Sequence, residues 1–398
     1  MGNKRVPEVR FEGFSGEWEE RIIGDFLKES RVPGNNGLNA KKLTVKLWGK
    51  GVIPKDDVYK GSESTSYYLR KAGQFIYGKL DFLNQAFGII PDKLDGYEST
   101  LDSPAFDINK NLNPTFLLEY VSRKQFYLYQ GTIANGSRKA KRIHSDTFYE
   151  MPLIVPRFNE QTQIGNFFKQ LDETIALHQQ ELDTLKQTKQ GFLQKMFPKE
   201  GESVPEIRFP GFSGEWEKRT LGEITESFSG GTPSVGNKSY YGGDIPFIRS
   251  AEINSESTEL FITEEGLDKS SAKMVEKGDI LYALYGATSG EVGISQLHGA
   301  INQAILAIKP KAGYNSYFLS QWLKKQKSSI ISTYLQGGQG NLSGSIVKNL
   351  ITPLPINKVE QTQIGNFFKQ LDETIALQQK ELDALKETKK AFLQKMFI

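Results

Sequence analysis

The sequence contains no cysteine, which excludes disulfide bonds and thiolate metal sites. No apolar run approaches the roughly 20 residues that a membrane-spanning helix needs. The first residues, MGNKRVPEV, lack the apolar stretch of a secretory signal, so we expect a soluble, cytoplasmic protein. The formal net charge is only +3 over 398 residues, far too low for a non-specific nucleic-acid coat. A chain of this length has room for two or three domains.

Recognisable catalytic motifs are also missing. The sequence has no G-x-x-x-x-G-K-[ST] phosphate loop and no G-x-G-x-x-G after a strand pattern, and its three histidines fall at unrelated places in the two halves. Asn-Pro-Thr-Phe at 113–116 is faintly similar to the Asn-Pro-Pro-Tyr/Phe motif of adenine methyltransferases. A helix start explains Pro114 more simply, and the corresponding residues 315–318 read Asn-Ser-Tyr-Phe. The chain is therefore predicted to be non-catalytic.

What the sequence does contain is a long internal repeat. Residues 160–197 and 360–397 differ at only six of 38 positions, at an offset of 200. A second repeated stretch, VPEVRFEGFSGEWEERIIGDF from Val6 and VPEIRFPGFSGEWEKRTLGEI from Val204, has an offset of 198. Between these repeats the two halves diverge almost completely. The pattern predicts two similar scaffolds with different inserts, a layout suited to performing one task on two targets.

The repeated 160–197 and 360–397 segments predict two long helices. Their apolar residues keep a 3.5-residue period over more than four heptads, which is typical of a coiled-coil seam. Each helix would be about 57 Å long at 1.5 Å per residue. The predicted helix–helix seam comprises Ile164, Phe168, Leu171, Ile175, Leu182, Leu185, Ile364, Phe368, Leu371, Ile375, Leu382 and Leu385.

The second copy in the same chain is the simplest partner for each seam. The turn-rich PKEGES after Phe197 and the insert that follows leave room for antiparallel packing, with the globular parts at opposite ends. Parallel packing would set them side by side. His178 and Gln378 would lie in the seam, where a polar pair can fix the register, or the seam simply tolerates one polar residue. No metal site is predicted, because no second histidine or carboxylate repeats around His178.

Both inserts predict a β-rich globular part followed by a helix. Matching helix patterns begin at Asn113 and Asn315, at an offset of 202. The strand patterns lie at 74–80, 87–90, 279–285, 291–295 and 304–308. The expected fold class is therefore α/β (α+β), with two similar globular domains joined by two long antiparallel coiled-coil helices in a pseudo-two-fold internal repeat.

Loops of the second insert that do not match the first are candidate reading surfaces. Residues 230–243 combine a flexible backbone with a cation and two tyrosines, 286–290 join two expected strands, and 336–341 offer amides that suit adenine edges in a major groove. An ordinary solvated loop side chain is the alternative for each position. The candidate DNA-binding residues here are Lys238, Tyr240, Tyr241, Thr288, Ser289, Gln336, Gln339 and Asn341.

The first part of the chain is the more basic. Residues 1–159 hold 24 Lys+Arg against 19 Asp+Glu, whereas 201–359 hold 15 against 16. The basic run at 138–142 suits phosphate oxygens, and a second cluster at 67–71 mixes tyrosines with cations. The candidate DNA-binding residues of this insert are Tyr67, Tyr68, Arg70, Lys71, Arg138, Lys139, Lys141 and Arg142.

The chain resembles the DNA-specificity subunits of type I restriction–modification systems over essentially its whole length. The motifs that carry the resemblance are R-F-x-G-F-S-G-E-W-E at 10–19 and 208–217, and E-Q-x-x-I at 160–164 and 360–364. Gly-Gly-Thr-Pro at 230–233 is also similar to that family, whereas the first insert lacks it, as expected of a domain that reads another sequence. The resemblance implies target-recognition domains at 1–159 and 201–359 and conserved spacer helices at 160–200 and 360–398.

The resemblance also implies a function and partners. Each target-recognition domain would read one half of a bipartite, asymmetric site in double-stranded DNA, while the helices fix the spacer and dock two modification (methyltransferase) subunits. Two restriction (translocase and nuclease) subunits would complete the complex. S-adenosylmethionine, ATP and Mg are then expected on the partner subunits and no cofactor on this chain. The rival is a non-catalytic two-domain coiled-coil scaffold for protein interactions, and a neighbouring methyltransferase gene would count against it.

Overall fold

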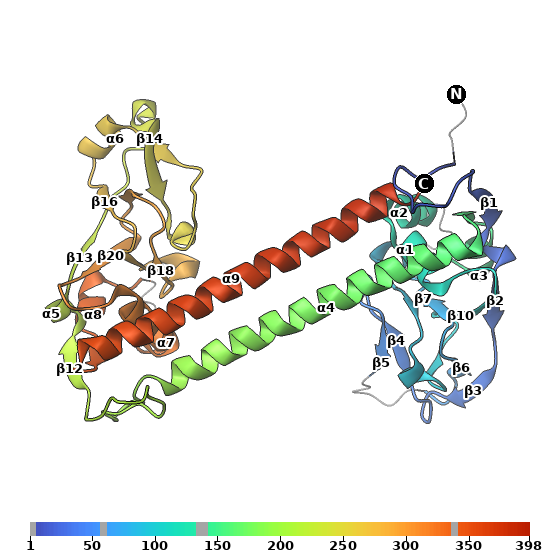
Figure 1. The fold of residues 1–398 in the computed structure, drawn as a ribbon, viewed down its shortest axis with the longest axis horizontal. Helices are drawn as coiled ribbons and strands as arrows, with labels where there is room; N and C mark the ends of the chain where they lie inside the picture. The colour runs from blue at the N-terminus through green and yellow to red at the C-terminus, as the bar shows by residue number, and fades with distance from the viewer. Residues whose placement is uncertain (1–4, 56–61, 133–141, 336–340) are drawn as a thin grey trace. The chain divides into compact units, whose positions relative to one another are not determined.

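The computed structural model describes residues 5–55, 62–132, 142–335 and 341–398. Contacts divide the chain into two compact units: Met1–Gln179 with Lys380–Ile398, here unit 1, and Gln180–Gln379, here unit 2. Each unit contains one insert, one end of the first long helix and the opposite end of the second (Figure 1).

Unit 1 is a mixed structure of short strands and helices. Its strands are β1 (Glu19–Ile22), β2 (Leu27–Ser30), β3 (Pro33–Asn36), β4 (Leu43–Val45), β5 (Val52–Pro54), β6 (Ser66–Leu69), β7 (Phe75–Tyr77), β8 (Phe87–Ile89), β9 (Glu98–Ser99), β10 (Ala105–Ile108) and β11 (Pro152–Val155). Its helices are α1 (Pro114–Ser122), α2 (Lys124–Thr132), α3 (Ser145–Tyr149), the first part of α4 (Phe158–Lys195) and the last part of α9 (Lys358–Lys395).

Unit 2 is built from the same kinds of elements. Its strands are β12 (Glu217–Thr220), β13 (Thr225–Ser229), β14 (Tyr241–Ile248), β15 (Phe261–Ile262), β16 (Lys273–Val275), β17 (Ile280–Ala283), β18 (Val292–Ile294), β19 (Gly299–Ile301), β20 (Ile305–Pro310) and β21 (Ile351–Leu354). Its helices are α5 (Leu221–Ile224), α6 (Glu264–Asp268), α7 (Ser316–Tyr334), α8 (Gly344–Lys348) and the remaining parts of α4 and α9.

The central sheet of the two units has the same topology. Unit 1 orders its four antiparallel strands β2-β10-β7-β8, and unit 2 orders its strands β13-β20-β17-β18. In each unit the strand after the leading motif pairs with the strand before the long helix, as β1 with β11 and as β12 with β21. The predictions of an α+β class and of a fold shared by the two inserts are confirmed.

The outer sheets differ between the units. Unit 1 adds a three-stranded sheet, β3-β6-β9, and the hairpin β4-β5. Unit 2 instead adds a four-stranded sheet, β15-β14-β19-β16, in which β14 and β19 run parallel. The two scaffolds therefore present different surfaces on a common core.

A buried ion pair fixes the leading motif to the start of each long helix. Arg10 donates from Nε and one Nη to the two carboxylate oxygens of Glu160, at 2.6 and 2.7 Å. Arg208 binds Glu360 at the same two distances in unit 2. Glu160 and Glu360 are buried, so each carboxylate depends on its guanidinium partner for solvation. The arginine of each R-F-x-G-F motif thus fixes the motif to the first turn of the long helix in its unit.

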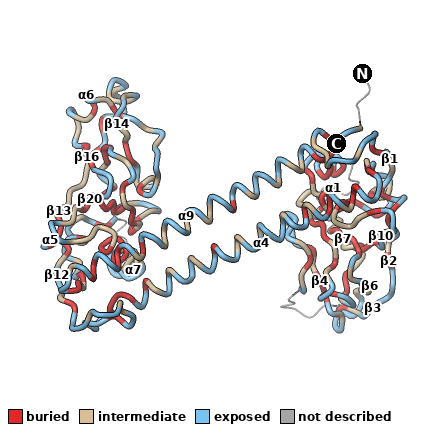
Figure 2. Tube along the Cα trace, viewed as in Figure 1, coloured by how far each residue is buried: buried red, intermediate tan, exposed pale blue. Residues whose placement is uncertain are grey.

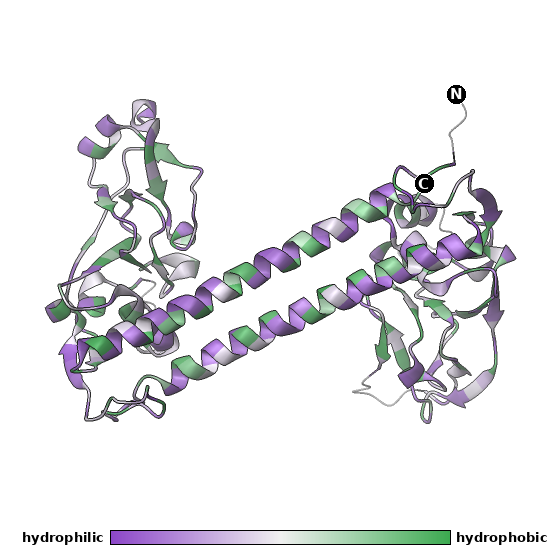
Figure 3. Cartoon of the chain, viewed as in Figure 1, coloured by the Kyte–Doolittle hydropathy of each residue, from purple (hydrophilic) through white to green (hydrophobic). Residues whose placement is uncertain are grey.

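The two long helices pack antiparallel within each unit. In unit 1, Phe167 of α4 meets Phe392 of α9 edge to face at 5.0 Å, and in unit 2 Phe192 meets Phe367 in the same way at 5.0 Å. Residue numbers rise along α4 as they fall along α9, which confirms the antiparallel prediction. Figure 3 shows hydrophobic residues recurring between hydrophilic ones along both helices. In the part of the chain that the structure describes, no helix is both long and apolar enough to cross a bilayer.

The first seam positions belong to the globular cores rather than to a free coiled coil. Ile164 and Phe168 lie in the core of unit 1, and Ile364 and Phe368 lie in that of unit 2. Further along, Leu182 and Leu382 are buried, while the other seam leucines and isoleucines are half-buried (Figure 2). A two-stranded seam leaves its apolar residues partly open, because only one partner helix covers them.

The polar seam residues contact glutamates of the opposite helix. His178 Nδ1 lies 4.0 Å from the Glu381 carboxylate in unit 1, and Gln378 donates to Glu181 at 2.9 Å in unit 2. Glu181 and Glu381 are equivalent residues of the repeat. The predicted pairing of His178 with Gln378 stays a prediction.

The end of each long helix completes the aromatic core of the unit in which it finishes. Phe397, two residues after α9, packs against Phe116, Phe168 and Trp18 at ring distances of 5.3, 5.8 and 6.3 Å. Arg123 holds this end by donating to the carbonyl oxygen of Ile398 at 2.8 Å. The C-terminal residues are therefore part of the core around the first insert.

Phe197 has the equivalent role after α4. It packs against Phe318, Trp216 and Phe368 at 5.1, 6.1 and 6.2 Å. Lys325, at the position of Arg123, donates to the carbonyl oxygens of Phe197 and Pro198 at 3.0 Å each. Both cores thus contain a phenylalanine from a helix that began in the other unit.

A buried carboxylate distinguishes unit 1 from unit 2 at one otherwise matched position. Lys389 donates to Glu119 at 3.0 Å and to Asp172 at 2.7 Å. In unit 2 the position of Glu119 is Gln321, whose amide donates to Asp372 at 3.4 Å. Burial raises the pKa of Glu119 to about 7, and the nearby Lys389 only partly offsets this.

We expect Glu119 to make the stability of unit 1 pH-dependent. The pKa of Glu119 in the folded state lies above the ordinary 4.5, so the folded state binds this proton more tightly than the unfolded state does. Proton binding therefore stabilises the folded state at low pH, and this contribution is lost as the pH rises toward 7. Glu119→Gln, which copies Gln321, should make the free energy of unfolding fall less between about pH 5 and about pH 8 than in the wild type. Chemical denaturation at both pH values measures it. An equal fall in both proteins would contradict the expectation, and Gln321→Glu should introduce a similar dependence in unit 2.

Candidate nucleic-acid interface

Backbone hydrogen bonds bring the predicted loops of unit 2 together at one end of its central sheet, where β13 and β17 end and β20 begins. Gly230 N–H donates to Asn302 O at 3.2 Å, and Leu284 N–H donates to Ala304 O at 2.8 Å. Leu342 N–H donates in turn to Leu284 O at 2.9 Å, and Asn341 forms a bridge with Tyr285. The segments after β13, after β17 and before α8 are therefore neighbours, although they are far apart in the sequence.

The Gly-Gly-Thr-Pro segment needs its two glycines for close packing. A Cβ on Gly230 would collide with the carbonyl oxygen of Ile301, and one on Gly231 would collide with Ser271. The close approach lets Thr232 donate its hydroxyl to Gln303 Oε1 at 2.8 Å. A cavity of about 370 Å³ opens beside this loop and is lined by Thr232, Val235, Tyr241, Phe247, Arg249, Leu260 and Asn302.

Several predicted residues of unit 2 lie on or next to this surface. Lys238 is exposed, Tyr240 is half-buried, and Tyr241 lines the cavity while its hydroxyl donates to Pro233 O at 2.6 Å. Thr288 is half-buried, with its hydroxyl bonded to Tyr285 O at 3.3 Å, and Asn341 is exposed. Gln336 and Gln339 lie outside the described residues.

Ser289 requires a correction. It is buried, and its hydroxyl donates to Leu284 O at 3.3 Å, so it stabilises the turn after β17 and is not available to DNA. The sequence pattern identified the turn but not the direction of this side chain.

The predicted tyrosines and Lys71 of unit 1 lie along and just beyond β6. Tyr67 and Tyr68 are half-buried and line a groove of about 260 Å³, while Lys71 is exposed. The Lys42 ammonium lies 5.5 Å from the Tyr67 ring centroid and the Arg70 guanidinium 5.6 Å from that of Tyr68. The tyrosine rings are therefore held in place by cations beneath the surface.

Arg70 is also corrected, because it is fully buried. Its Nε donates to the Ser99 hydroxyl and one Nη donates to Ser30 O, both at 2.7 Å. Burial lowers the pKa of Arg70 to about 10, so it stays charged at neutral pH while it holds β2, β6 and β9 together. Its function is structural and it does not contact DNA.

The basic run before α3 is only partly described. Arg138, Lys139 and Lys141 lie outside the described residues, whereas Arg142 is half-buried and pairs with Asp102 at 2.9 Å. An Arg142 that is paired in this way would have to exchange Asp102 for a phosphate. The prediction of a phosphate contact by this run stays a prediction.

Sequence reasoning missed four polar residues around the cavity of unit 2 and one beside the groove of unit 1. These are Thr232, Arg249, Asn302, Gln303 and Asn35. Thr232 lies in the Gly-Gly-Thr-Pro stretch that was singled out. The pair Asn302–Gln303 has no local turn signature and joins the surface through the backbone bond of Asn302 to Gly230 and the hydrogen bond of Gln303 with Thr232.

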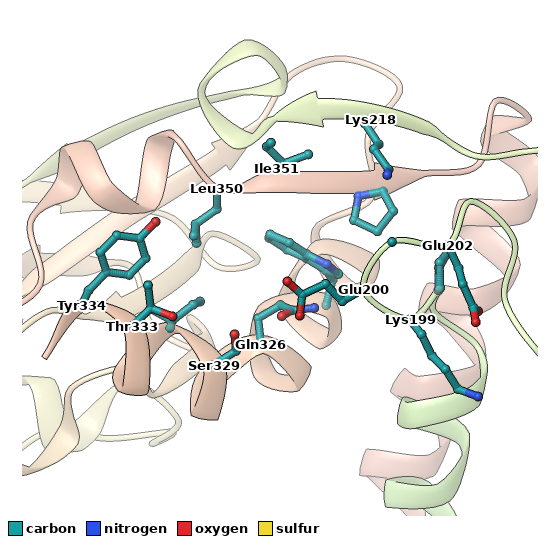
Figure 4. Close-up of a pocket in the computed structure, with 15 residues that line it drawn as sticks. Lys199, Glu200, Glu202, Lys218, Gln326, Ser329, Thr333, Tyr334, Leu350 and Ile351 are labelled. Carbon is teal, nitrogen blue, oxygen red and sulfur yellow. The ribbon is translucent and has the colours of Figure 1, made fainter. Parts of the chain in front are cut away.

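A further cavity lies away from these loops. It measures about 360 Å³ and lies where the linker after α4 passes α7 and the β12–β21 pair (Figure 4). Trp322, Ile330 and Leu350 contribute apolar surface, and Lys199 and Lys218 contribute cations. Of the predicted DNA-binding residues that the structure describes, none lines this cavity.

The motif at 113–116 is a helix start. Asn113 Oδ1 accepts from the backbone N–H of Phe116 at 3.0 Å and Pro114 occupies the first turn of α1, as the sequence predicted. Asn315 caps α7 in the same way. Among the described residues, no group of three or more His, Cys, Asp or Glu side chains gathers in a manner suited to a metal ion.

Two units with one core topology, different surface loops and shared antiparallel helices define a two-domain recognition protein. The chain belongs to the type I restriction modification DNA specificity domain family, whose family model matches residues 16–187 and 213–387. The family resemblance inferred from the repeated motifs is thereby confirmed.

Named relatives agree with this family. The chain is 24% identical over 288 residues to the type I restriction enzyme specificity subunit MjaX of Methanocaldococcus jannaschii, covering 70% of this chain and 65% of the relative. It is 29% identical over 192 residues to the MjaIX specificity subunit of the same organism, covering 46% and 44%. The chain thus aligns with less than two thirds of the length of either relative.

Solved structures share the fold over almost the whole chain. The S subunit of a type I restriction–modification system from M. genitalium matches with a TM-score of 0.66 at 14% identity, covering 99% of both chains. A chain from a structure on the assembly of a type I restriction–modification system matches with a TM-score of 0.53 at 19% identity, covering 96% of this chain and 97% of the other.

Proposed function

We propose that this chain is the sequence-specific DNA-binding subunit of a type I restriction–modification complex. Each unit reads one half of a bipartite, asymmetric site in double-stranded DNA, and the helices set the spacer between the halves. The observation that carries the proposal is one sheet order, repeated in both units, beneath outer sheets and loops that differ. A common scaffold with different readers suits a site whose two halves differ in sequence.

The repeated helices supply two equivalent docking surfaces for one kind of partner. Leu177 and its repeat equivalent Leu377 are apolar, yet they are 55% and 59% exposed. Exposed polar residues also recur unchanged between the two helices, for example Gln163 as Gln363 and Asn166 as Asn366. Packing in a core explains why buried residues are identical in α4 and α9. Identical residues at exposed positions instead support binding of the same kind of partner by both helices. Two copies of a modification subunit, one for each unit, fit this duplication.

In unit 1 this docking surface includes a groove of about 350 Å³ beside the first turns of α4. Phe11 of the leading motif and Phe167 of the helix form one wall at a ring distance of 5.8 Å. In unit 2, Phe209 and Phe367 repeat the contact at 5.9 Å. An aromatic wall beside exposed amides suits a partner helix with both apolar and polar side chains.

Catalysis and cofactors belong to partner subunits in this proposal. The modification subunits bind S-adenosylmethionine and methylate DNA, while two restriction subunits bind ATP and Mg and cleave it. The complex acts in the cytoplasm, where chromosomal DNA is present. The small net charge of +3 supports this division, because partners that enclose the DNA share the neutralisation of its phosphates.

Exchanging one insert tests the proposal. Replacement of residues 27–150 by the insert of another family member leaves the β1–β11 pair and the long helices intact, because it begins after Phe26 and ends before Met151. Methylation mapping of the assembled complex should show one half-site replaced, with the other half and the spacer unchanged. The bases recognised in that half-site should be replaced completely by those of the donor protein.

The matched exchange is residues 225–349, which covers β13 to α8 of unit 2. It should replace the other half-site. If either exchange altered both halves, the assignment of one unit to one half-site would be wrong. A wild-type assembly that shows no sequence preference would instead favour the scaffold interpretation.

A further inference from the structure

The groove of unit 1 contains an asparagine whose side chain is locked from below. Asn35 lies exposed on β3, the edge strand of the β3-β6-β9 sheet. The carboxylate of Glu98, which is only 2% exposed, accepts from Asn35 Nδ2 at 2.6 Å and from the Asn35 backbone N–H at 2.6 Å. Two hydrogen bonds from one residue to one buried carboxylate hold the Asn35 amide in a single place.

Gly34 makes this arrangement possible. A Cβ at this position would collide with the carboxylate of Glu98. The glycine lets the backbone of β3 lie directly against that carboxylate, so that Asn35 is the first side chain to emerge above it. The contact of Gly34 and Asn35 with Glu98 is therefore part of the packing of the β3-β6-β9 sheet.

The chemistry of the carboxylate decides which way the amide faces. An ionised carboxylate only accepts hydrogen bonds, so the nitrogen of Asn35 and not its oxygen must face Glu98. Asn35 Oδ1 and the second N–H of Nδ2 stay available on the exposed side. The neighbouring Asn36 differs, because its Oδ1 accepts from Leu38 N–H at 3.1 Å within the turn.

One acceptor and one donor on a planar amide match the major-groove edge of adenine, which offers the N6 amino group and the N7 acceptor. The surrounding groove is lined by Tyr67, Tyr68, Thr65 and Ser66. Arg31, which precedes β3, has 63% of its side chain exposed and pairs with Glu29 at 2.9 Å. A pair of strands fits into the major groove of B-DNA. The groove therefore combines a fixed amide with aromatic walls, while Arg31 beside it would have to exchange Glu29 for a phosphate.

We propose that Asn35, positioned by Glu98, reads an adenine in the half-site recognised by unit 1. This inference rests on the proposed function and adds to it one residue, one base and the groove of DNA in which they meet. Glu98 is a positioning residue, since it acts only through Asn35.

The test uses the complex assembled with its modification subunits and a library of randomised DNA sites. Asn35→Ala should lower the preference for one A·T pair in the unit 1 half-site by about 10- to 100-fold, the range expected from losing one bidentate contact. The other half-site, read in the same reaction, should stay as strict as before, which shows that the variant is folded and assembled.

Two further variants sharpen the result. Glu98→Gln keeps the size of the side chain but adds a donor, so the Asn35 amide is free to turn over, and preference at the same A·T pair should fall by a smaller factor. Asn39→Ala removes an exposed amide from the turn that follows β3 and should leave the preference at every position of the site unchanged.

Three outcomes for Asn35→Ala would overturn the inference. The variant could keep the wild-type base preference at every position, lose preference at a G·C pair, or lose preference in the half-site that the exchange of 225–349 replaces. In each of them the wild-type complex still reads two half-sites, so the proposed function survives. Failure of the proposed function is a different result, in which the wild-type complex itself shows no bipartite preference.

Discussion

Phe397→Ala is expected to destabilise unit 1, which contains the first insert, and to leave unit 2 unchanged, although Phe397 is the penultimate residue of the chain. The ring is 4% exposed and contacts Trp18, Phe116 and Phe168. Removing a buried phenylalanine costs about 3–5 kcal/mol, because both burial and packing contacts are lost. Amide hydrogen exchange should accelerate by about two to four orders of magnitude in α1 and in the sheet of unit 1.

Phe197→Ala is the matched control. Phe197 occupies the same place in unit 2, against Trp216, Phe318 and Phe368, so its removal should accelerate exchange in α7 and in the central sheet of unit 2. If Phe397→Ala instead accelerated exchange near Trp216, or in neither unit, the division of the chain into these two units would be refuted.

Adding four helix-favouring residues to both α4 and α9 is expected to lengthen the spacer of the recognised DNA site. The insertions belong after Gln179 and Gln379, where each helix passes from one unit to the other, so the contacts inside each unit are kept. Four residues add about 6 Å of helix, close to the rise of two base pairs. Methylation mapping should show both half-sites unchanged and a spacer longer by about two base pairs.

The control is the replacement of four exposed residues at the same places without any change of length. It should keep the original spacer. An unchanged spacer in the lengthened protein would show that the helices do not set the distance between the half-sites.

The long helices were predicted closely because their signal is local. The 3.5-residue period of Ile164, Phe168 and Leu171 and its exact repetition predicted helices at 160–197 and 360–397, and the structure has them at Phe158–Lys195 and Lys358–Lys395. The strand patterns around Phe75 and Ile280 were also predicted. In each of these cases the periodicity of one segment carries the information.

The surface residues were predicted less well because burial is a property of the whole fold. Arg70 stands in a polar, aromatic stretch that is typical of a binding loop, yet its guanidinium is buried and donates hydrogen bonds to carbonyl groups of other strands. Ser289 was misplaced for a similar reason. Asn35 belongs to no recognisable motif. It became a candidate only because its amide is oriented by Glu98, which lies 63 residues further along the chain.

The sequence by itself determined the duplication, the two long helices and the family, because repeats and heptads can be detected in one dimension. Only the tertiary structure decided which helix end completes which core, which polar side chains stay at the surface, and how Glu98 orients Asn35. Those outcomes depend on contacts between residues distant in the sequence, and the periodicity of a single segment carries no record of them.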